Sequence, residues 1–144
     1  MEGTVRTAVS TATPQQLFAV AADLASYPEW AEGVKGVEIL ETDAEGRATS
    51  ARFDVEAMVR RISYVLDYTY DAPNQMTWRA EPGEDIEEME GSYRFTETED
   101  GGTEVVYALA VTPAFNVPGF LRSQAERHIV TTALRSLRRR AEAE

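Results

Sequence analysis

Aromatic residues that carry a hydrogen-bonding group recur along the middle of this chain. They are Tyr64, Tyr68, Trp78, Tyr93 and Tyr107, each in a segment where apolar and polar residues alternate. Alternation predicts strands whose aromatic side chains share one face. A buried tyrosine hydroxyl needs a hydrogen-bond partner, so several on one apolar face suit a pocket that holds water or a ligand. Each residue alone fits a packed core equally well, but the group favours a pocket.

His128 is the single histidine and a weak candidate for a general base. Helical spacing places it at the margin of a stripe that contains Leu121, Ala125 and Thr132. Proton transfer would require this part of the helix to face a ligand. The alternative is a partly exposed or hydrogen-bonded histidine on the helix, which we favour because no carboxylate that could orient the ring stands nearby in the sequence.

Other reaction types have little support. The acidic run of Glu84, Asp85, Glu87, Glu88 and Glu90 matches no calcium loop and suits a solvated edge. There is no cysteine, phosphate-binding loop or histidine-rich metal spacing. We therefore expect no cofactor and no metal.

Length and charge narrow the class of protein. The 144 residues predict a single domain, residues 1–144. The net charge of −11 argues against nucleic acids and anionic membranes as partners. No apolar run approaches the length of a membrane span and the first residues resemble no signal peptide, so we expect a cytoplasmic protein without membrane insertion. A homodimer is left open.

An arginine cluster ends the chain: Arg135, Arg138, Arg139 and Arg140. Positive charge at a helix C-terminus complements the helix dipole, which is the simpler interpretation. The alternative is a patch that binds an acidic partner.

The elements that would position these residues follow a definite order. Val5, Thr7 and Val9 alternate with polar or small residues and predict a first strand with those three side chains buried. Thr13-Pro14 predicts a helix start, and Pro28 a second short helix that carries Tyr27 and Trp30.

A series of strands follows, because the period is two from Val34 to Val111 and turn residues separate the segments. Short connections predict an antiparallel meander. A long helix from Pro118 to about Arg140 ends the series, and its four-residue spaced row is expected to face the sheet: Leu121, Ala125, Ile129, Ala133 and Leu137.

Asp23-Leu24-Ala25-Ser26-Tyr27-Pro28-Glu29-Trp30 resembles the D-x-x-x-Y-P-x-W segment of the START/Bet v 1-like (SRPBCC) superfamily, in its polyketide cyclase/dehydrase and coenzyme Q-binding branch. Gly91-Ser92-Tyr93-Arg94-Phe95 is similar to a strand of the same family. The resemblance implies an α+β helix-grip fold. In it, a curved antiparallel sheet of about seven strands wraps around a long C-terminal helix, with two short helices after strand 1 and a cavity between sheet and helix.

Three functions stay open at this stage. The first is binding or transport of a hydrophobic small molecule: a lipid, an isoprenoid quinone or a polyketide-like aromatic. The second is a polyketide cyclase or dehydratase, with His128 or a tyrosine moving a proton; the resemblance implies no catalytic motif, so an enzyme is the weaker hypothesis. The third is a protein-interaction module like the family's ribosome-associated toxins. The expected ligand-binding residues are Tyr64, Tyr68, Trp78, Met89, Tyr93, Tyr107, Phe115, Leu121, Ala125 and His128.

Overall fold

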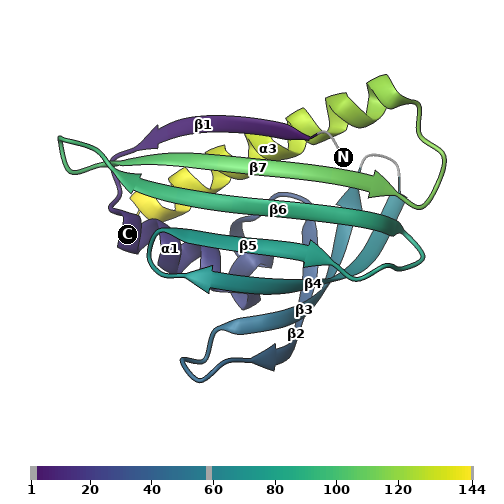
Figure 1. Ribbon diagram of the computed structural model, residues 1–144, viewed down its shortest axis with the longest axis horizontal. Helices are drawn as coiled ribbons and strands as arrows, with labels where there is room; N and C mark the ends of the chain where they lie inside the picture. Colours follow the sequence, from purple (N-terminus) through teal and green to yellow (C-terminus); the bar gives the residue numbers. More distant parts are fainter. Residues whose placement is uncertain (1–2, 58–59, 144) are drawn as a thin grey trace.

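A computed structural model describes residues 3–57 and 60–143 (Figure 1). The strands are β1 (Thr4–Ser10), β2 (Val34–Thr42), β3 (Ala48–Ala57), β4 (Arg60–Asp71), β5 (Gln75–Ala80), β6 (Ile86–Glu97) and β7 (Thr103–Pro113). The helices are α1 (Pro14–Ala22), the 3-10 turn η1 (Leu24–Ser26), α2 (Tyr27–Trp30) and α3 (Gly119–Glu142).

One antiparallel sheet contains all seven of these strands, in the order β1-β7-β6-β5-β4-β3-β2. Each strand from β2 to β6 pairs with the next along the chain, and β1 joins the far side of β7. α1 and α3 lie on the same side of the sheet (Figure 1). The predicted α+β helix-grip fold is confirmed.

The N-terminal helices are fixed by local hydrogen bonds. Thr13 and Gln16 form a capping box at the start of α1, as the sequence predicts. The Tyr27 hydroxyl donates to the carbonyl oxygen of Ala21, at 2.5 Å, and the Tyr27 ring packs on Trp30 and Phe53. The Tyr-Pro-x-Trp segment therefore holds α2 against the sheet.

The expected orientation of β1 is wrong. Val5 and Val9 are 65% and 59% exposed on the outer face, while Ser10 is buried beside α3. By type, Val5 and Val9 fit a buried face better than the alternating set that contains Arg6, but the small residues Ala8 and Ser10 of that set are the ones that let α3 approach. The valines lie outward because no layer covers the outer face of the sheet there.

The expected inward row of α3 is also partly wrong, because Ile129 is 41% exposed. Steps of four residues advance about 40° around a helix, so a five-member row turns away from any one face. The buried residues of α3 are instead Glu126, Val130, Thr132, Leu134, Leu137 and Ala141.

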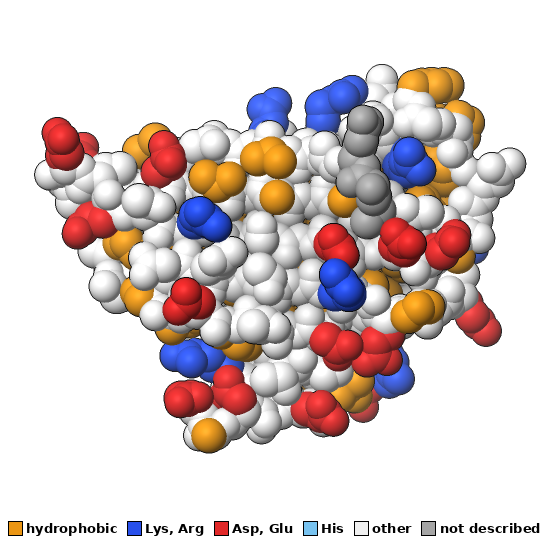
Figure 2. Space-filling model, viewed as in Figure 1, with side chains coloured by type: hydrophobic (Ala, Val, Ile, Leu, Met, Phe, Trp, Pro, Cys, Tyr) orange, Lys and Arg blue, Asp and Glu red, His pale blue; other side chains and the backbone are white. Residues whose placement is uncertain are grey.

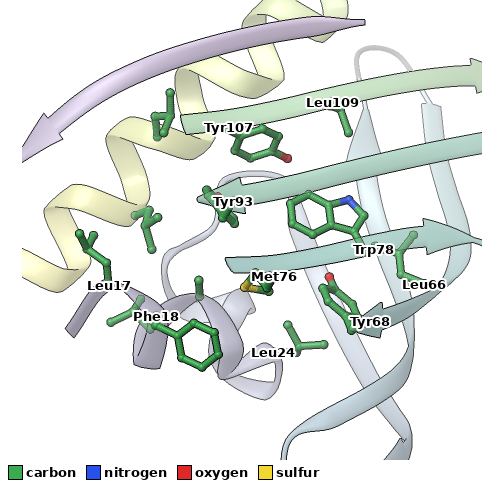
Figure 3. Packing of buried hydrophobic residues seen from close by; sticks show 14 of the residues in the cluster. Leu17, Phe18, Leu24, Leu66, Tyr68, Met76, Trp78, Tyr93, Tyr107 and Leu109 are labelled. Carbon is green, nitrogen blue, oxygen red and sulfur yellow. The ribbon is translucent and has the colours of Figure 1, made fainter. Parts of the chain in front are cut away.

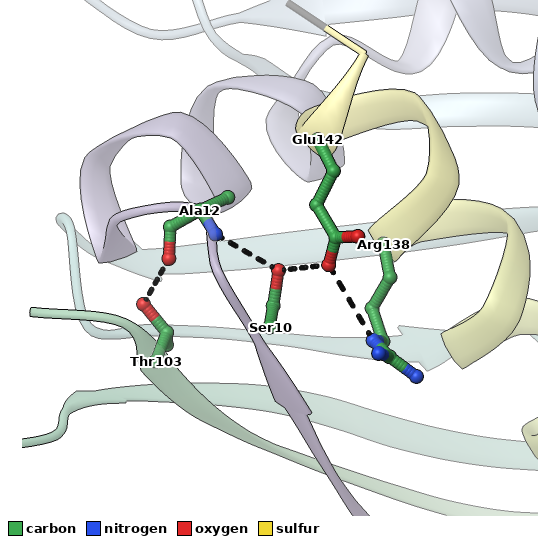
Figure 4. Close-up of polar contacts among 5 residues, drawn as sticks. All are labelled: Ser10, Ala12, Thr103, Arg138 and Glu142. Atoms are coloured by element: carbon green, nitrogen blue, oxygen red, sulfur yellow. Dashed lines mark hydrogen bonds and ion pairs between the residues drawn. The ribbon is translucent and has the colours of Figure 1, made fainter. Parts of the chain in front are cut away.

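Polar contacts at both ends hold α3 to β1. Near its N-terminal end, the Glu126 carboxylate accepts hydrogen bonds from the Thr4 hydroxyl, at 3.2 Å, and from the Val111 backbone N–H, at 2.8 Å. Near its C-terminal end, the Ser10 hydroxyl donates to Glu142 at 2.6 Å (Figure 4). The same Ser10 oxygen accepts from the backbone N–H of Ala12.

Candidate functional site

The inner face of the sheet carries one row of residues in register from β4 to β7. Tyr68 pairs with Trp78, Trp78 with Gly91, and Gly91 with Leu109. Gly91 has no side chain, and a Cβ there would lie 2.2 Å from Cε2 of Trp78. The indole of Trp78 therefore occupies the space that any other residue at position 91 would fill.

Trp78 is the centre of an aromatic cluster. Its ring centroid is 5.8 Å from that of Tyr68, 5.5 Å from Tyr93 and 5.6 Å from Tyr107. Figure 3 shows these four side chains next to one another on β4, β5, β6 and β7. Phe53 extends the cluster to Tyr64, whose ring stacks on it at 5.7 Å. The structure thus brings together the five polar aromatics that the sequence singled out.

Four tyrosines of this cluster, three buried and Tyr64 partly buried, are unusual because their hydroxyl groups have no hydrogen-bond partner in the described structure. Within the described part of the chain, no hydrogen bond reaches the hydroxyls of Tyr64, Tyr68, Tyr93 and Tyr107. Among the described residues, only Nε of Arg138 is both shielded from solvent and without a hydrogen-bond partner. A tyrosine hydroxyl that lacks a partner and is not in this class must therefore be accessible to solvent. The four hydroxyls are therefore not enclosed, and each opens onto space that a water molecule can reach.

The remaining two tyrosines provide a contrast. The hydroxyl of Tyr27 donates to the carbonyl oxygen of Ala21, and that of Tyr70 donates to the carbonyl oxygen of Ala48 at 2.5 Å. Tyr27 and Tyr70 thus have a structural role for their polar atoms, whereas the other four hydroxyls keep their hydrogen-bonding capacity.

Burial raises the pKa of every tyrosine. It is the main cause for Tyr64, Tyr68, Tyr93 and Tyr107, whose pKa values lie well above the usual value near 10. Repulsion from neighbouring tyrosines adds to the rise: Tyr107 acts on Tyr68 and Tyr93, and Tyr64 acts on Tyr107. The hydroxyls therefore lie within electrostatic range of one another and are all protonated at neutral pH.

Apolar residues surround the tyrosine cluster on the inner face of the sheet. Met89 and Leu109 are buried on the inner face of the sheet. Phe115 is half-buried in the loop before α3, and the Arg60 guanidinium lies over its ring, 4.1 Å from the centroid. None of the described charged side chains is buried except Glu126, and the partners of Glu126 are Thr4 and Val111.

The α3 candidates divide into two groups. Leu121 and Ala125 are half-buried, but His128 is exposed. Thr132 is buried, and it lies seven residues after Ala125, which is the same side of the helix. Thr132 is a polar residue of this side that was not among the predicted site residues, although its helical spacing from Ala125 could have indicated it.

The C-terminal arginines are only partly free. Arg140 forms an ion pair with Glu29, at 3.0 Å, and Arg138 one with Glu142, at 3.6 Å. Arg135 and Arg139 are exposed. Arg140 thus joins α3 to α2, whereas the Arg138–Glu142 pair lies within α3 itself.

Metal and membrane sites have no counterpart in the described residues. No cluster of three or more His, Asp or Glu side chains suited to a metal occurs among residues 3–57 and 60–143. No helix in these ranges has the length and apolar character needed to span a membrane.

Comparison with known proteins identifies the family. Residues 10–138 match the family model described as polyketide cyclase / dehydrase and lipid transport. None of the curated proteins matches this chain.

Solved structures agree on the fold. A START superfamily protein from Mycobacterium smegmatis is 22% identical, with a TM-score of 0.89 over 98% of this chain and 97% of that one. The Zhui aromatase/cyclase from Streptomyces sp. R1128 is 16% identical, with a TM-score of 0.74 over 98% and 93%. A STAR-related lipid transfer protein from Xanthomonas axonopodis is 19% identical, with a TM-score of 0.72 over 96% and 84%. On the family match, this chain belongs to the polyketide cyclase/dehydrase and lipid-transport family, whose members bind hydrophobic ligands.

Proposed function

We propose that this protein binds an uncharged, oxygen-bearing aromatic small molecule, such as a quinone or a polyketide-like aromatic, between the inner face of its sheet and α3. One observation carries the proposal: four tyrosine hydroxyls on an apolar face have no described protein partner and are not enclosed. Such groups donate hydrogen bonds to carbonyl or hydroxyl oxygens of a ligand.

The walls favour a flat and uncharged ligand. The rings of Tyr68, Tyr93 and Tyr107 lie with their centroids 5.5–5.8 Å from that of Trp78, so together they form an aromatic surface. Such a surface favours contact with another aromatic ring. Among the described residues no basic side chain is buried beside the tyrosine rings, and burying an unpaired carboxylate or phosphate there is costly. These features support a quinone or polyketide-like aromatic over a lipid whose charged headgroup is buried.

Binding is better supported than catalysis. A cyclase or dehydratase needs a group that takes up a proton near neutral pH. His128 is exposed on α3, and the tyrosines stay protonated because burial raises their pKa. Protonated phenols donate hydrogen bonds but do not act as bases. We therefore propose Tyr64, Tyr68, Trp78, Met89, Tyr93, Tyr107, Phe115, Leu121, Ala125 and Thr132 as binding residues.

Native mass spectrometry of the purified protein, compared with its denatured mass, tests this proposal directly. The expected result is a one-to-one complex with a neutral aromatic compound, identified after extraction. For a protein purified without ligand, quenching of tryptophan fluorescence by a neutral naphthoquinone measures affinity. An equally tight complex with a fatty acid, or no binding of either probe, would contradict the proposal.

Matched variants locate the site. Tyr93→Phe removes a hydroxyl without a described partner and should weaken quinone binding by about three- to tenfold, because one hydrogen bond contributes about 0.5–1.5 kcal/mol. His128→Ala should leave affinity unchanged. Equal losses in both variants would place the ligand elsewhere.

A further inference from the structure

The two edges of the sheet differ in how they are protected. β2, at one edge, has three register shifts against β3 and carries Lys35, Glu38 and Glu41. β1, at the other edge, pairs with β7 without a shift and contains neither lysine nor proline. Proteins commonly protect sheet edges with charges, prolines and irregularities. β1 carries one charge, Arg6, but no proline and no irregularity, so its edge is less protected than that of β2 and is open to another strand.

The outer face of β1 is apolar at the same place. Val5 and Val9 are 65% and 59% exposed, the largest exposed fractions among the described aliphatic side chains of the sheet. Their neighbours on β7 are Ala108 and Glu104. Figure 2 shows hydrophobic side chains gathered over β1 and β7 on this face. An open edge thus coincides with exposed apolar surface.

The hydrogen-bonding pattern identifies the free backbone groups of this edge. The Val111 N–H bonds to Glu126 at the point where β1 would continue, so it points to the β1 side of β7. Groups alternate along an antiparallel strand, so the N–H groups of Leu109 and Tyr107 also point to β1. Their partners there are Thr4 and Arg6.

The intervening residues of β1 must point the other way. By the same alternation, Val5, Thr7 and Val9 direct their N–H and C=O groups to the free edge. These three residues are therefore both the hydrogen-bonding set of the edge and the outward-facing set of side chains.

We propose that β1 pairs antiparallel with β1 of a second copy of this chain, about a twofold axis at Thr7. In this register Thr7 faces the partner's Thr7, and Val5 faces the partner's Val9. This register gives hydrogen-bond partners to the backbone groups of Val5, Thr7 and Val9 and places the two valines against each other across the pair. Arg6 lies opposite the partner's Ala8, so like charges do not face each other directly. This self-complementarity indicates a second copy over an unrelated strand. The two sheets become continuous, as in an isologous dimer.

Sedimentation velocity from about 1 to about 200 µM protein measures the assembly, because dimer formation depends on concentration. The expected result is a monomer–dimer equilibrium. V5K/V9K places lysines opposite each other in both symmetric pairs and should raise the dimer dissociation constant at least about tenfold. V5E/V9K differs only at position 5, places opposite charges in both pairs, and should restore dimerisation. Ile39→Lys, at the β2 edge, should change nothing.

Three sedimentation results would overturn the proposal: a wild-type monomer over the whole range, a dimer that V5K/V9K leaves intact, or a V5E/V9K variant that dimerises no better than V5K/V9K. Thermal denaturation of each variant separates lost pairing from lost folding, since the substituted positions are exposed. Hydrogen exchange of the wild type gives a second measurement. The amides of Val5, Thr7 and Val9 should become protected as concentration rises, and unprotected amides at the concentration of a measured dimer would also overturn it.

Discussion

Replacing Gly91 by alanine tests whether the indole of Trp78 depends on the missing side chain. The added Cβ would lie 2.2 Å from Cε2 and 2.3 Å from both Cζ2 and Nε1 of Trp78. Ordinary contact begins near 3.4 Å, so the indole must move by about 1 Å. The rings of Tyr68, Tyr93 and Tyr107 surround it and restrict that movement.

The expected cost is about 1–3 kcal/mol of unfolding free energy, which is typical when a methyl group is forced into a packed interior. For a chain near this length, the melting temperature should fall by about 2–4 °C for each kcal/mol. Because the displaced indole moves into the proposed ligand space, affinity for a naphthoquinone should fall as well. Thermal denaturation and fluorescence titration measure the two effects on the same sample.

Two comparisons make the prediction specific. Gly36→Ala, in β2, adds a methyl group whose nearest neighbour is 3.6 Å away, so it should be neutral or slightly stabilising. In a Trp78→Leu background the conflicting ring atoms are absent, so Gly91→Ala should cost little there, and a double-mutant cycle measures the coupling. The reasoning is refuted if Gly91→Ala is as stable as the wild type, or if its cost persists beside Trp78→Leu.

Three further predictions concern the polar groups. Tyr107→Phe should leave the melting temperature nearly unchanged. Tyr70→Phe removes the hydrogen bond to the Ala48 carbonyl and should cost about 1 kcal/mol of unfolding free energy in thermal denaturation. Equal losses of stability in the two variants would contradict the assignment of free and bonded hydroxyls. Burial raises the pKa of Tyr70 to about 12 and those of the other tyrosines above 10. Their contribution to stability is therefore complete below pH 10 and is lost as the pH rises further. Tyrosinate absorbance should appear only together with unfolding, and phenols that titrate near pH 10 in the folded protein would refute this. Glu126→Ala should cost about 1–3 kcal/mol because the Val111 N–H loses its acceptor, and hydrogen exchange should show faster exchange at Val111; unchanged exchange there would show that the carboxylate is not its partner.

Alternation alone predicted much of the fold and the inner face. In β4 to β6 one set of side chains is apolar and the other is mostly polar or charged, so Tyr68, Trp78 and Tyr93 could be assigned to one side. In β7 the alternating set Val106, Ala108 and Ala110 is apolar too, so alternation alone left the side of Tyr107 open. β1 departs from this rule, because its more apolar set lies on the outer face. Its position at an edge depends on pairing with a strand about a hundred residues away, which alternation does not reveal.

Features that depend on three-dimensional approach could not be predicted. By its type and its place on a helix, Glu126 is expected at the surface. Because β1 begins at Thr4, the Val111 N–H of β7 has no partner in β1, and the Glu126 carboxylate accepts its hydrogen bond instead. The freedom of the four tyrosine hydroxyls likewise depends on the curvature of the sheet and the distance to α3. Neither quantity follows from the order of residues in a strand.

The position of β1 has a consequence for how the chain folds. Six strands pair with neighbours in sequence, so their hairpins form through short loops and close at low entropic cost. β1 is synthesised first among the strands but pairs with the last, Thr4 with Leu109. Until β7 is available, the apolar edge of β1 has no native partner within the chain. The nascent chain therefore carries the edge of β1 unpaired until β7 has been made, and early contacts between neighbouring nascent chains at this strand would compete with closure of the sheet.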